Sequence, residues 1–184
     1  MRYIFVLILA LWAQQIMAQE WEDRQLFTDG KATKTLRILS NTDTRFFAPI
    51  IESFLVTQPS VSIDYLVTSS ADLYDIYRAS PGDFDIVISS AMDLQFKLTN
   101  DGYALALGNL EHPPWAQWRQ SLFAFSTEPA AIMINRAAFK GIPIPRSRQD
   151  LIEILRARPE FFRGRIGTYD IRRSGLGYFF ATQD

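Results

Sequence analysis

Residues 35–56, TLRILSNTDTRFFAPIIESFLV, decide the fold class of this 184-residue chain. The first six residues of the stretch favour a β-strand, and its last twelve place large apolar side chains at helical spacing. Pro49 fits this helix only near the first turn, because proline donates no backbone hydrogen bond. The stretch therefore predicts a strand that runs through a polar loop, residues 40–44, into an amphipathic helix.

A second unit of the same kind follows directly. Residues 62–70, SIDYLVTSS, predict a strand, and residues 71–80, ADLYDIYRAS, predict a helix. Ser69 or Ser70 is the expected N-cap of this helix, and Asp72 in the first turn complements the helix dipole.

A third unit occupies residues 84–102. The segment FDIVISS, residues 84–90, predicts a strand that is buried on both faces, since its middle is apolar throughout. The helix that follows is expected to stop at Gly102. Three successive strand-to-helix units indicate an α/β domain with a mostly parallel sheet.

Each predicted strand is followed by a polar loop. These loops are SNTDT (40–44), TSS (68–70) and SSAMD (89–93). The carboxyl ends of parallel strands share one edge of a sheet, where hydroxyl groups and free helix amides can converge on a ligand. Two interpretations stay open at this point, a ligand site and ordinary helix caps.

The middle of the chain is patterned differently. Residues 107–120 form a loop rich in turn formers and aromatic side chains, in which Trp115 and Trp118 favour packing over an exposed docking patch. Residues 121–139 predict a strand, a polar break at 126–129 and a second strand. The break is a candidate crossover or hinge between domains.

The last part of the chain predicts a new helix, strand and helix. A proline-rich turn precedes Ser147, which is the expected N-cap, with Asp150 three residues later, of a helix that ends before Pro159. Residues 164–170, GRIGTYD, predict a strand, and residues 174–184 predict the start of another helix.

The polar segment RRSG, residues 172–175, lies at the start of that last helix. Ser174 supplies a hydroxyl group, Gly175 allows close approach, and Arg172 and Arg173 add positive charge beside the positive end of the helix dipole. This combination suits a carboxylate, a phosphate or another oxyanion. A simple cap with solvated arginines accounts for the same residues.

Composition excludes several classes of protein. The 19 basic and 20 acidic residues are interspersed, so no polybasic field is present for nucleic acid. The chain has no cysteine, so no disulfide framework and no thiolate metal site are expected. His112 is the single histidine and has no nucleophile motif nearby, so we expect no enzyme activity, no bound metal and no cofactor.

Residues 1–18 read as a secretory signal peptide. One basic residue, Arg2, precedes an apolar run that is too short for a typical membrane span, and Ala18 stands at a plausible cleavage site. We therefore expect an exported product that begins near Gln19.

The three strand-to-loop segments, together with AAIMINRAAF and FRGRIGTYDIRRSGLGYFF, resemble the type 2 periplasmic solute-binding proteins of ABC transporters. Within that class they resemble extracellular solute-binding family 1, which includes ferric-iron and inorganic-anion binders. The resemblance runs from about residue 35 to the end of the chain. It implies two α/β domains joined by crossover strands, which close on a solute.

Carried over by position, the resemblance also implies the site residues. The first domain would contribute Thr42, Asp43, Ser69, Ser70, Ser89 and Ser90. The second domain would contribute Arg172, Ser174 and Gly175.

The chain departs from the ferric members of this family. They supply a histidine after the first strand, a glutamate after the third and a later pair of tyrosines, whereas this sequence has Asn41 at the first place and Ala91 near the second. An organic acid or an inorganic anion fits the hydroxyl-rich loops better than a ferric site built from side chains.

The resemblance also implies a domain plan. Residues 19–34 form an N-terminal extension, 35–125 a first α/β domain, 126–136 the crossover or hinge, and 137–184 part of a second domain. Two domains of ordinary size need roughly 300 residues, so the second domain is expected to be incomplete and the chain to be truncated.

The expected function is capture of a small anionic solute in the periplasm for the membrane permease of an ABC transporter. Two alternatives stay open. The protein could present its ligand to a membrane sensor kinase, or it could be a non-functional fragment of a binding protein.

Overall fold

The computed structural model describes residues 21–108, 110–127, 131–172, 174 and 177. The predicted signal peptide and Gly175 lie outside the described residues. The chain divides into two compact units, residues 1–92 and 93–184, which are described in turn. The assignment of residues 126–136 as a crossover stays a prediction.

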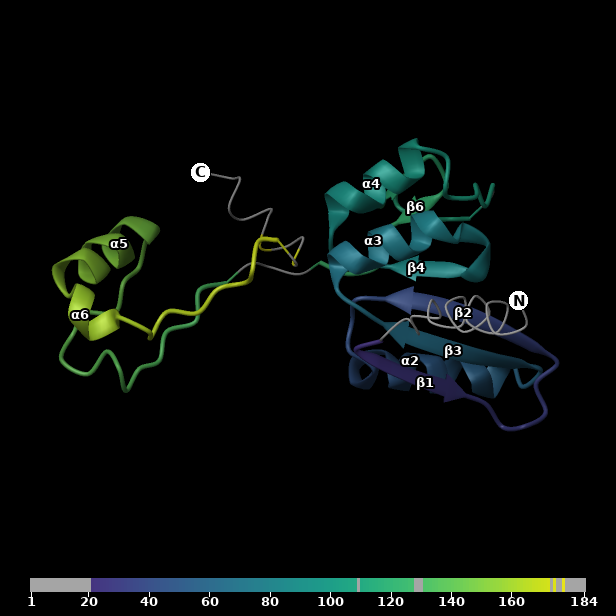
Figure 1. The fold of residues 1–184 in the computed structure, drawn as a ribbon, viewed down its shortest axis with the longest axis horizontal. Helices are drawn as coiled ribbons and strands as arrows, with labels where there is room; N and C mark the ends of the chain where they lie inside the picture. Colours follow the sequence, from purple (N-terminus) through teal and green to yellow (C-terminus); the bar gives the residue numbers. More distant parts are fainter. Residues whose placement is uncertain (1–20, 109, 128–130, 173, 175–176, 178–184) are drawn as a thin grey trace, which may run out of the picture. The chain divides into compact units, whose positions relative to one another are not determined.

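The first unit is built on a four-stranded mixed sheet (Figure 1). Its order is β1 (Asp23–Phe27), β3 (Val61–Val67), β2 (Lys34–Ser40) and β4 (Ile86–Ile88). β2 pairs in parallel with both β3 and β4, whereas β1 runs antiparallel to β3. The α/β class and the mostly parallel sheet predicted from the sequence are therefore confirmed.

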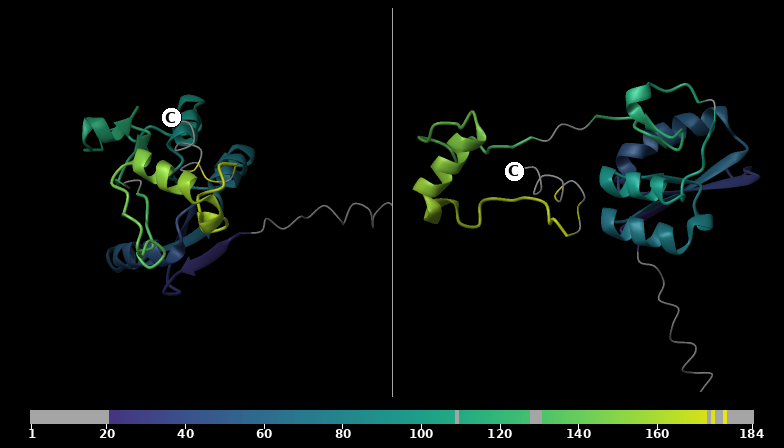
Figure 2. Two further views of the ribbon diagram at one scale, coloured as in Figure 1. Left: turned by 90° about the vertical axis from the view of Figure 1, so that its left-hand side faces the viewer. Right: turned by 90° about the horizontal axis from the view of Figure 1, so that it is seen from above.

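Two helices cover opposite faces of this sheet (Figure 1), and Figure 2 shows the same arrangement from two other directions. α2 (Thr44–Thr57) packs on one face through Ile51, and α3 (Ser70–Ala79) packs on the other through Leu73. Alternate residues of β2 and β3 therefore point into two separate cores, as the pleat of a sheet requires.

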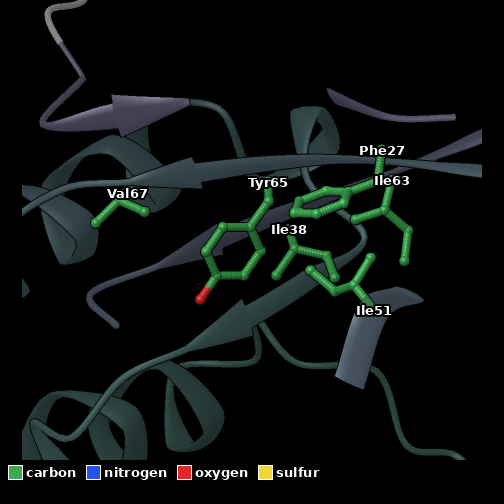
Figure 3. Close-up of a cluster of buried hydrophobic side chains, with 6 residues drawn as sticks. All are labelled: Phe27, Ile38, Ile51, Ile63, Tyr65 and Val67. Atoms are coloured by element: carbon green, nitrogen blue, oxygen red, sulfur yellow. The ribbon is translucent and has the colours of Figure 1, made fainter. Parts of the chain in front are cut away.

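The larger core lies between α2 and the sheet (Figure 3). Its buried members are Phe27, Ile38, Ile51, Ile63, Tyr65 and Val67. The second core, beneath α3, contains Leu39, Leu66, Leu73 and Phe84. Each fully buried aliphatic side chain contributes about 1.5–3 kcal/mol, so these two clusters hold the unit together.

An ion pair joins the added strand β1 to β3. The Asp64 carboxylate is buried, and it accepts hydrogen bonds from Nε and Nη2 of Arg24 at 2.9 and 2.8 Å. Arg37 lies 3.5 Å from the same carboxylate. The hydrogen bond and charge of Asp64 raise the pKa of Arg24, so the guanidinium group stays charged.

Strand β1 was not predicted. It lies within residues 19–34, which the sequence analysis treated only as an extension. The signal was weak because its five residues, DRQLF, include only two apolar side chains, of which Leu26 is 57% exposed. Pairing with β3 and the bond from Arg24 to Asp64 hold the strand, and both partners are distant in sequence.

The prediction that strand 84–90 is buried on both faces is wrong. β4 has only three residues, pairs with β2 alone and leaves Ile86 43% exposed. β4 begins after Asp85. The Asp85 carboxylate accepts a hydrogen bond from the Arg37 amide of β2 at 2.8 Å. An edge strand has a neighbour on one side only, so apolar composition does not guarantee burial.

Pro49 also lies further into its helix than predicted. α2 begins at Thr44, so Pro49 is its sixth residue rather than a member of the first turn. Pro49 and Arg45 are both exposed, so water can satisfy the Arg45 carbonyl that a residue with an N–H would have bonded.

The second unit contains shorter elements. α4 (Met92–Asn100) starts at the boundary and ends before Gly102, which has a φ of 85° as expected for a helix-stopping glycine. β5 (Gln117–Trp118) and β6 (Leu122–Phe123) form a two-stranded antiparallel hairpin. Short 3-10 helices occupy Pro81–Asp83 in the first unit and Pro114–Ala116 in the second.

The capped helix of the C-terminal region is confirmed. α5 (Arg148–Ala157) carries a capping box, in which Ser147 accepts from the Asp150 amide and the Asp150 side chain accepts from the Ser147 amide. α6 (Pro159–Phe162) follows at once. Phe139, Ile142 and Phe162 form a small buried cluster against α5.

Two further strand predictions are wrong. Neither residues 131–139 nor residues 164–170 form a strand, and no described segment pairs with them. Met133 is 95% exposed and Ile166 is 62% exposed, so β-type composition here finds no face on which to pack. Strand formation depends on a partner, which a local pattern cannot supply.

Replacing Tyr65 by Phe is expected to lower the free energy of unfolding by about 1–3 kcal/mol. The Tyr65 hydroxyl lies 2.8 Å from Ser40 Oγ and donates to the Thr42 carbonyl at 3.0 Å, and its ring is fully buried. Urea denaturation followed by circular dichroism measures the change. Tyr169→Phe, at an exposed ring, is the control and should change little. Equal stability of Tyr65→Phe and the parent would contradict the assignment.

The same residue gives a prediction at alkaline pH. Burial raises the pKa of Tyr65 above its ordinary value of 10.0, and the hydrogen bond with Ser40 opposes this less strongly. Its contribution to stability is complete below about pH 10 and is lost as the pH rises through the folded-state pKa. The stability difference between the parent and Tyr65→Phe should therefore narrow as the pH rises above about 10. A constant difference would refute the pKa shift.

Candidate functional site

Three polar loops lie side by side at one edge of the first unit's sheet. They follow the carboxyl ends of β2, β3 and β4, and main-chain hydrogen bonds continue the strand pairing into them. The Thr68 amide donates to the Ser40 carbonyl at 3.0 Å, and the Asn41 amide donates to the Ile88 carbonyl at 3.2 Å. These two bonds fix the spacing of the loops before any side chain acts.

The side chain of Asn41 joins all three loops. Its Nδ2 donates to Ser70 Oγ at 2.7 Å and to Ser90 Oγ at 3.0 Å. Its Oδ1 accepts from the Ser90 amide at 3.3 Å. Asn41 was not among the predicted site residues, although an amide directly after the middle strand was a usable signal.

The first loop is anchored from below by the core. Ser40 is fully buried, and its hydroxyl oxygen accepts from the Thr42 amide at 3.0 Å. The Tyr65 hydroxyl reaches the same loop from the margin of the α2 core (Figure 3). Thr42, one of the predicted ligand residues, is half-buried at this anchored turn.

Asp43 lies at the N-cap position of α2 but makes no side-chain capping bond. Its carboxylate lies 3.1 Å from an Arg45 guanidinium nitrogen, and both side chains are largely exposed. A surface pair of this kind is worth at most about 1 kcal/mol, so Asp43 can still interact with other groups. The neighbouring Thr44 hydroxyl instead donates to Asp23 of β1 at 2.6 Å.

Ser69 is the N-cap of α3, as predicted. Its hydroxyl oxygen accepts from the Asp72 amide at 3.2 Å, and the hydroxyl donates to the Asp72 carboxylate at 2.6 Å. The amides of Ser70 and Ala71, in the first turn of α3, have no acceptor within the helix. The two serines of this loop therefore differ, because Ser69 caps the helix while Ser70 faces Asn41.

The third loop shows the same division between its two serines. Ser89 Oγ accepts from the Ala91 amide at 3.1 Å, which closes a local turn. Ser90 is exposed and is bonded to Asn41 through both its amide and its hydroxyl. The structure thus brings Ser70 and Ser90 together through Asn41, while Ser69 and Ser89 serve their own loops.

The predicted site residues of the second unit form a local cluster of their own. Arg172 Nε and Nη2 donate to the Asp170 carboxylate at 3.0 and 2.9 Å, and the Arg172 amide donates to it at 2.9 Å. The hydrogen bond and charge of Asp170 raise the pKa of Arg172. Asp170, whose carboxylate offsets the charge of Arg172, was not among the predicted site residues.

Ser174 acts as a cap within that segment. Its hydroxyl oxygen accepts from the Gly177 amide at 3.2 Å, and its own amide donates to the Asp170 carbonyl at 2.9 Å. This geometry agrees with the cap interpretation. A contact with an anion at Ser174 and Gly175 stays a prediction.

His112 and Trp118 have packing partners of their own. His112 Nε2 lies 2.8 Å from the Ala124 carbonyl oxygen, and its ring contacts Phe123 edge-on. Trp118 donates to the Asn100 side chain at 3.0 Å. Trp115 is 83% exposed, so the prediction that its ring packs against the protein is wrong. Among the described residues, no group of three or more histidine, aspartate or glutamate side chains is arranged to hold a metal ion.

No helix among the described residues combines the length and the apolar character that crossing a bilayer requires.

Comparison with solved structures is informative. No family model and no curated protein matches the chain. Among solved structures, the chain is similar to the substrate-binding protein of an ABC transporter from Agrobacterium tumefaciens, with 32% identity and a TM-score of 0.79. The similarity covers 88% of this chain and 51% of that protein, so the chain spans about half of its length. This result supports the class predicted from the sequence.

Gly177→Ala is expected to loosen the Arg172–Ser174 segment. A Cβ atom at Gly177 would lie 2.7 Å from Tyr169 Cβ, so the chain at Gly177 and the chain at Tyr169 would have to move apart. Overpacking costs about 1–3 kcal/mol, which outweighs the 0.5–1 kcal/mol that alanine gains over glycine in a helix. Hydrogen exchange over residues 165–177 measures the effect.

Gly167→Ala is the matched control, because a Cβ at Gly167 meets no atom within 4 Å. It should leave the exchange rates unchanged. If both variants exchange like the parent, the close approach at Gly177 does not constrain the segment.

Proposed function

We propose that this protein is the extracytoplasmic solute-binding component of an ABC transporter and that it captures a small anionic solute. The observation that carries the proposal is the meeting of three polar loops at the carboxyl edge of the sheet. The chain is also 32% identical to a substrate-binding protein, in a similarity that covers 88% of this chain. The proposed solute belongs to one of three classes, the organic acids, the inorganic anions or the ferric complexes.

The chemistry of the first unit favours oxyanions over metal ions. Hydroxyl groups of Ser70 and Ser90 lie beside the first turn of α3, whose free amides and dipole attract negative charge. Of the nearby carboxylates, Asp72 accepts a hydrogen bond from Ser69, and Asp43 lies beside Arg45, whose positive charge offsets it. Thr42 and Ser89 complete the proposed contact set of this unit.

A second contact group is proposed at Arg172, Ser174 and Gly175. Arg172 holds its guanidinium group in a fixed orientation through Asp170, and part of the fork stays available to a solute. In this proposal a membrane permease then receives the solute. Export to the periplasm through the N-terminal signal peptide belongs to the same proposal.

One alternative has a specific observation behind it. The chain spans about half of the length of the protein it resembles, so the alternative is a chain that folds without capturing solute. Direct binding measurements on the chain distinguish this alternative from the proposed function.

The processing prediction concerns the N-terminus. When it is expressed with its own leader in a Gram-negative bacterium, the protein should be recovered from the periplasm. Its mass should be that of a chain starting at Gln19, because Ala18 precedes a plausible cleavage site. Mass spectrometry of the periplasmic and cytoplasmic fractions measures this. A product that keeps Met1 and stays in the cytoplasm would overturn the export proposal.

The binding prediction concerns Ser174. Calorimetric titration of the chain with phosphate, sulfate, acetate, succinate, citrate and ferric citrate should reveal binding of at least one probe. Ser174→Ala should weaken that binding about tenfold or somewhat more, since a hydrogen bond to a charged group is worth about 1.5–3 kcal/mol.

Ser80→Ala, an exposed serine at the end of α3, is the matched control and should bind like the parent. If Ser174→Ala also binds like the parent, the segment is only a helix cap. If the folded parent binds no probe, capture of an anionic solute by this chain is contradicted.

A further inference from the structure

The hydrogen bonds of Asn41 identify which end of its side-chain amide is which. A backbone N–H can only donate, so the atom that faces the Ser90 amide must be the carbonyl oxygen Oδ1. The other atom is therefore Nδ2, which carries two hydrogens and accepts nothing. Each of those hydrogens has one serine oxygen within reach, Ser70 Oγ at 2.7 Å and Ser90 Oγ at 3.0 Å.

This orientation determines what the two serines can offer. Each hydroxyl oxygen accepts from Asn41, so each hydroxyl hydrogen is left to donate elsewhere. In the part of the chain that the structure describes, neither hydroxyl donates to another group. Ser70 is only 7% exposed, so leaving its hydroxyl hydrogen without an acceptor costs free energy. A ligand oxygen that accepts this hydrogen removes the cost.

From this geometry we infer that Asn41 is a positioning residue that presents the Ser70 and Ser90 hydroxyl groups as paired hydrogen-bond donors to the solute. The inference rests on the proposed function and deepens it, because it assigns the recognition of solute oxygen atoms to a specific pair of hydroxyls. The preferred solute is one that presents acceptor oxygens without hydrogens, such as a carboxylate or a fully ionised oxyanion.

The surrounding charges agree with a donor pair. Ser70 is the first residue of α3, where the dipole of a ten-residue helix favours negative charge. Its neighbour Ser69 donates its own hydroxyl to the Asp72 carboxylate. Asn41 differs from Ser70 and Ser90 in that its donors are both consumed inside the protein, and its role is therefore indirect.

A double-mutant cycle tests this role. Calorimetric titration with the probe that binds the parent best, chosen among citrate, succinate and phosphate, should show about a tenfold or greater loss for Ser70→Ala and for Ser90→Ala. Asn41→Ala should weaken binding in the parent background. In the Ser70→Ala/Ser90→Ala background it should cause no further loss, because Asn41 acts only through the two hydroxyls.

Asn41→Asp distinguishes the direction of the Asn41 hydrogen bonds from the size of its side chain. A carboxylate has nearly the same size and still accepts from the Ser90 amide, but it would also accept from both hydroxyls and so remove the donors. Its loss of affinity should exceed that of Asn41→Ala. Ser62→Ala is the matched control, since Ser62 is a buried serine of the same unit whose hydroxyl bonds Thr35 at the start of the strands. It should bind like the parent.

The outcomes separate this inference from the proposed function. A folded parent that binds no probe contradicts both. If the parent binds and the Asn41→Ala loss is the same in the two backgrounds, only the role of Asn41 is overturned. Should Asn41→Ala fail to fold by circular dichroism, Ser70→Ala and Ser90→Ala decide the matter, because parent-like affinity in both refutes the donor pair.

Discussion

Parallel pairing of β2 with β3 and β4 is the constraint on which the rest of the first unit depends. Parallel strands cannot be joined by a tight turn, so each connection must cross over a face of the sheet, and α2 and α3 are those crossovers. Because they lie on opposite faces, both sides of β2 and β3 are buried. The same constraint sends the carboxyl ends of β2, β3 and β4 to one edge, which is why three separate polar loops meet there.

Meeting at an edge produces a site only because the loops are also tied to one another. Asn41 joins the second and third loops to the first, while Tyr65 holds the first loop from within the core. Bonds of this kind keep polar groups at fixed spacing without a ligand. The second unit achieves local order differently, through the carboxylate of Asp170, which holds Arg172 from within its own loop.

The sequence predicted those features that depend on neighbouring residues. Helical periodicity and capping residues located α2, α3, α4 and α5 closely, and the N-caps at Ser69 and Ser147 are confirmed. It failed where a distant partner decides the outcome. β1 exists because β3 lies beside it, β4 is half-exposed because it has one neighbour, and residues 164–170 form no strand in the described structure. Asn41 was missed for the same reason, since its partners are 29 and 49 residues away.

The antiparallel strand β1 has a consequence for how the chain acquires its structure during synthesis. Its partner strand lies far downstream, and the Arg24–Asp64 bond joins residues 40 positions apart. A growing chain therefore presents its first strand long before the strand that completes it has left the ribosome. β2 is nearer to β3 in sequence, so the parallel pair closes the shorter loop and can form first, and β1 then adds to an existing edge. The N-terminal strand is then the last of the three to be secured.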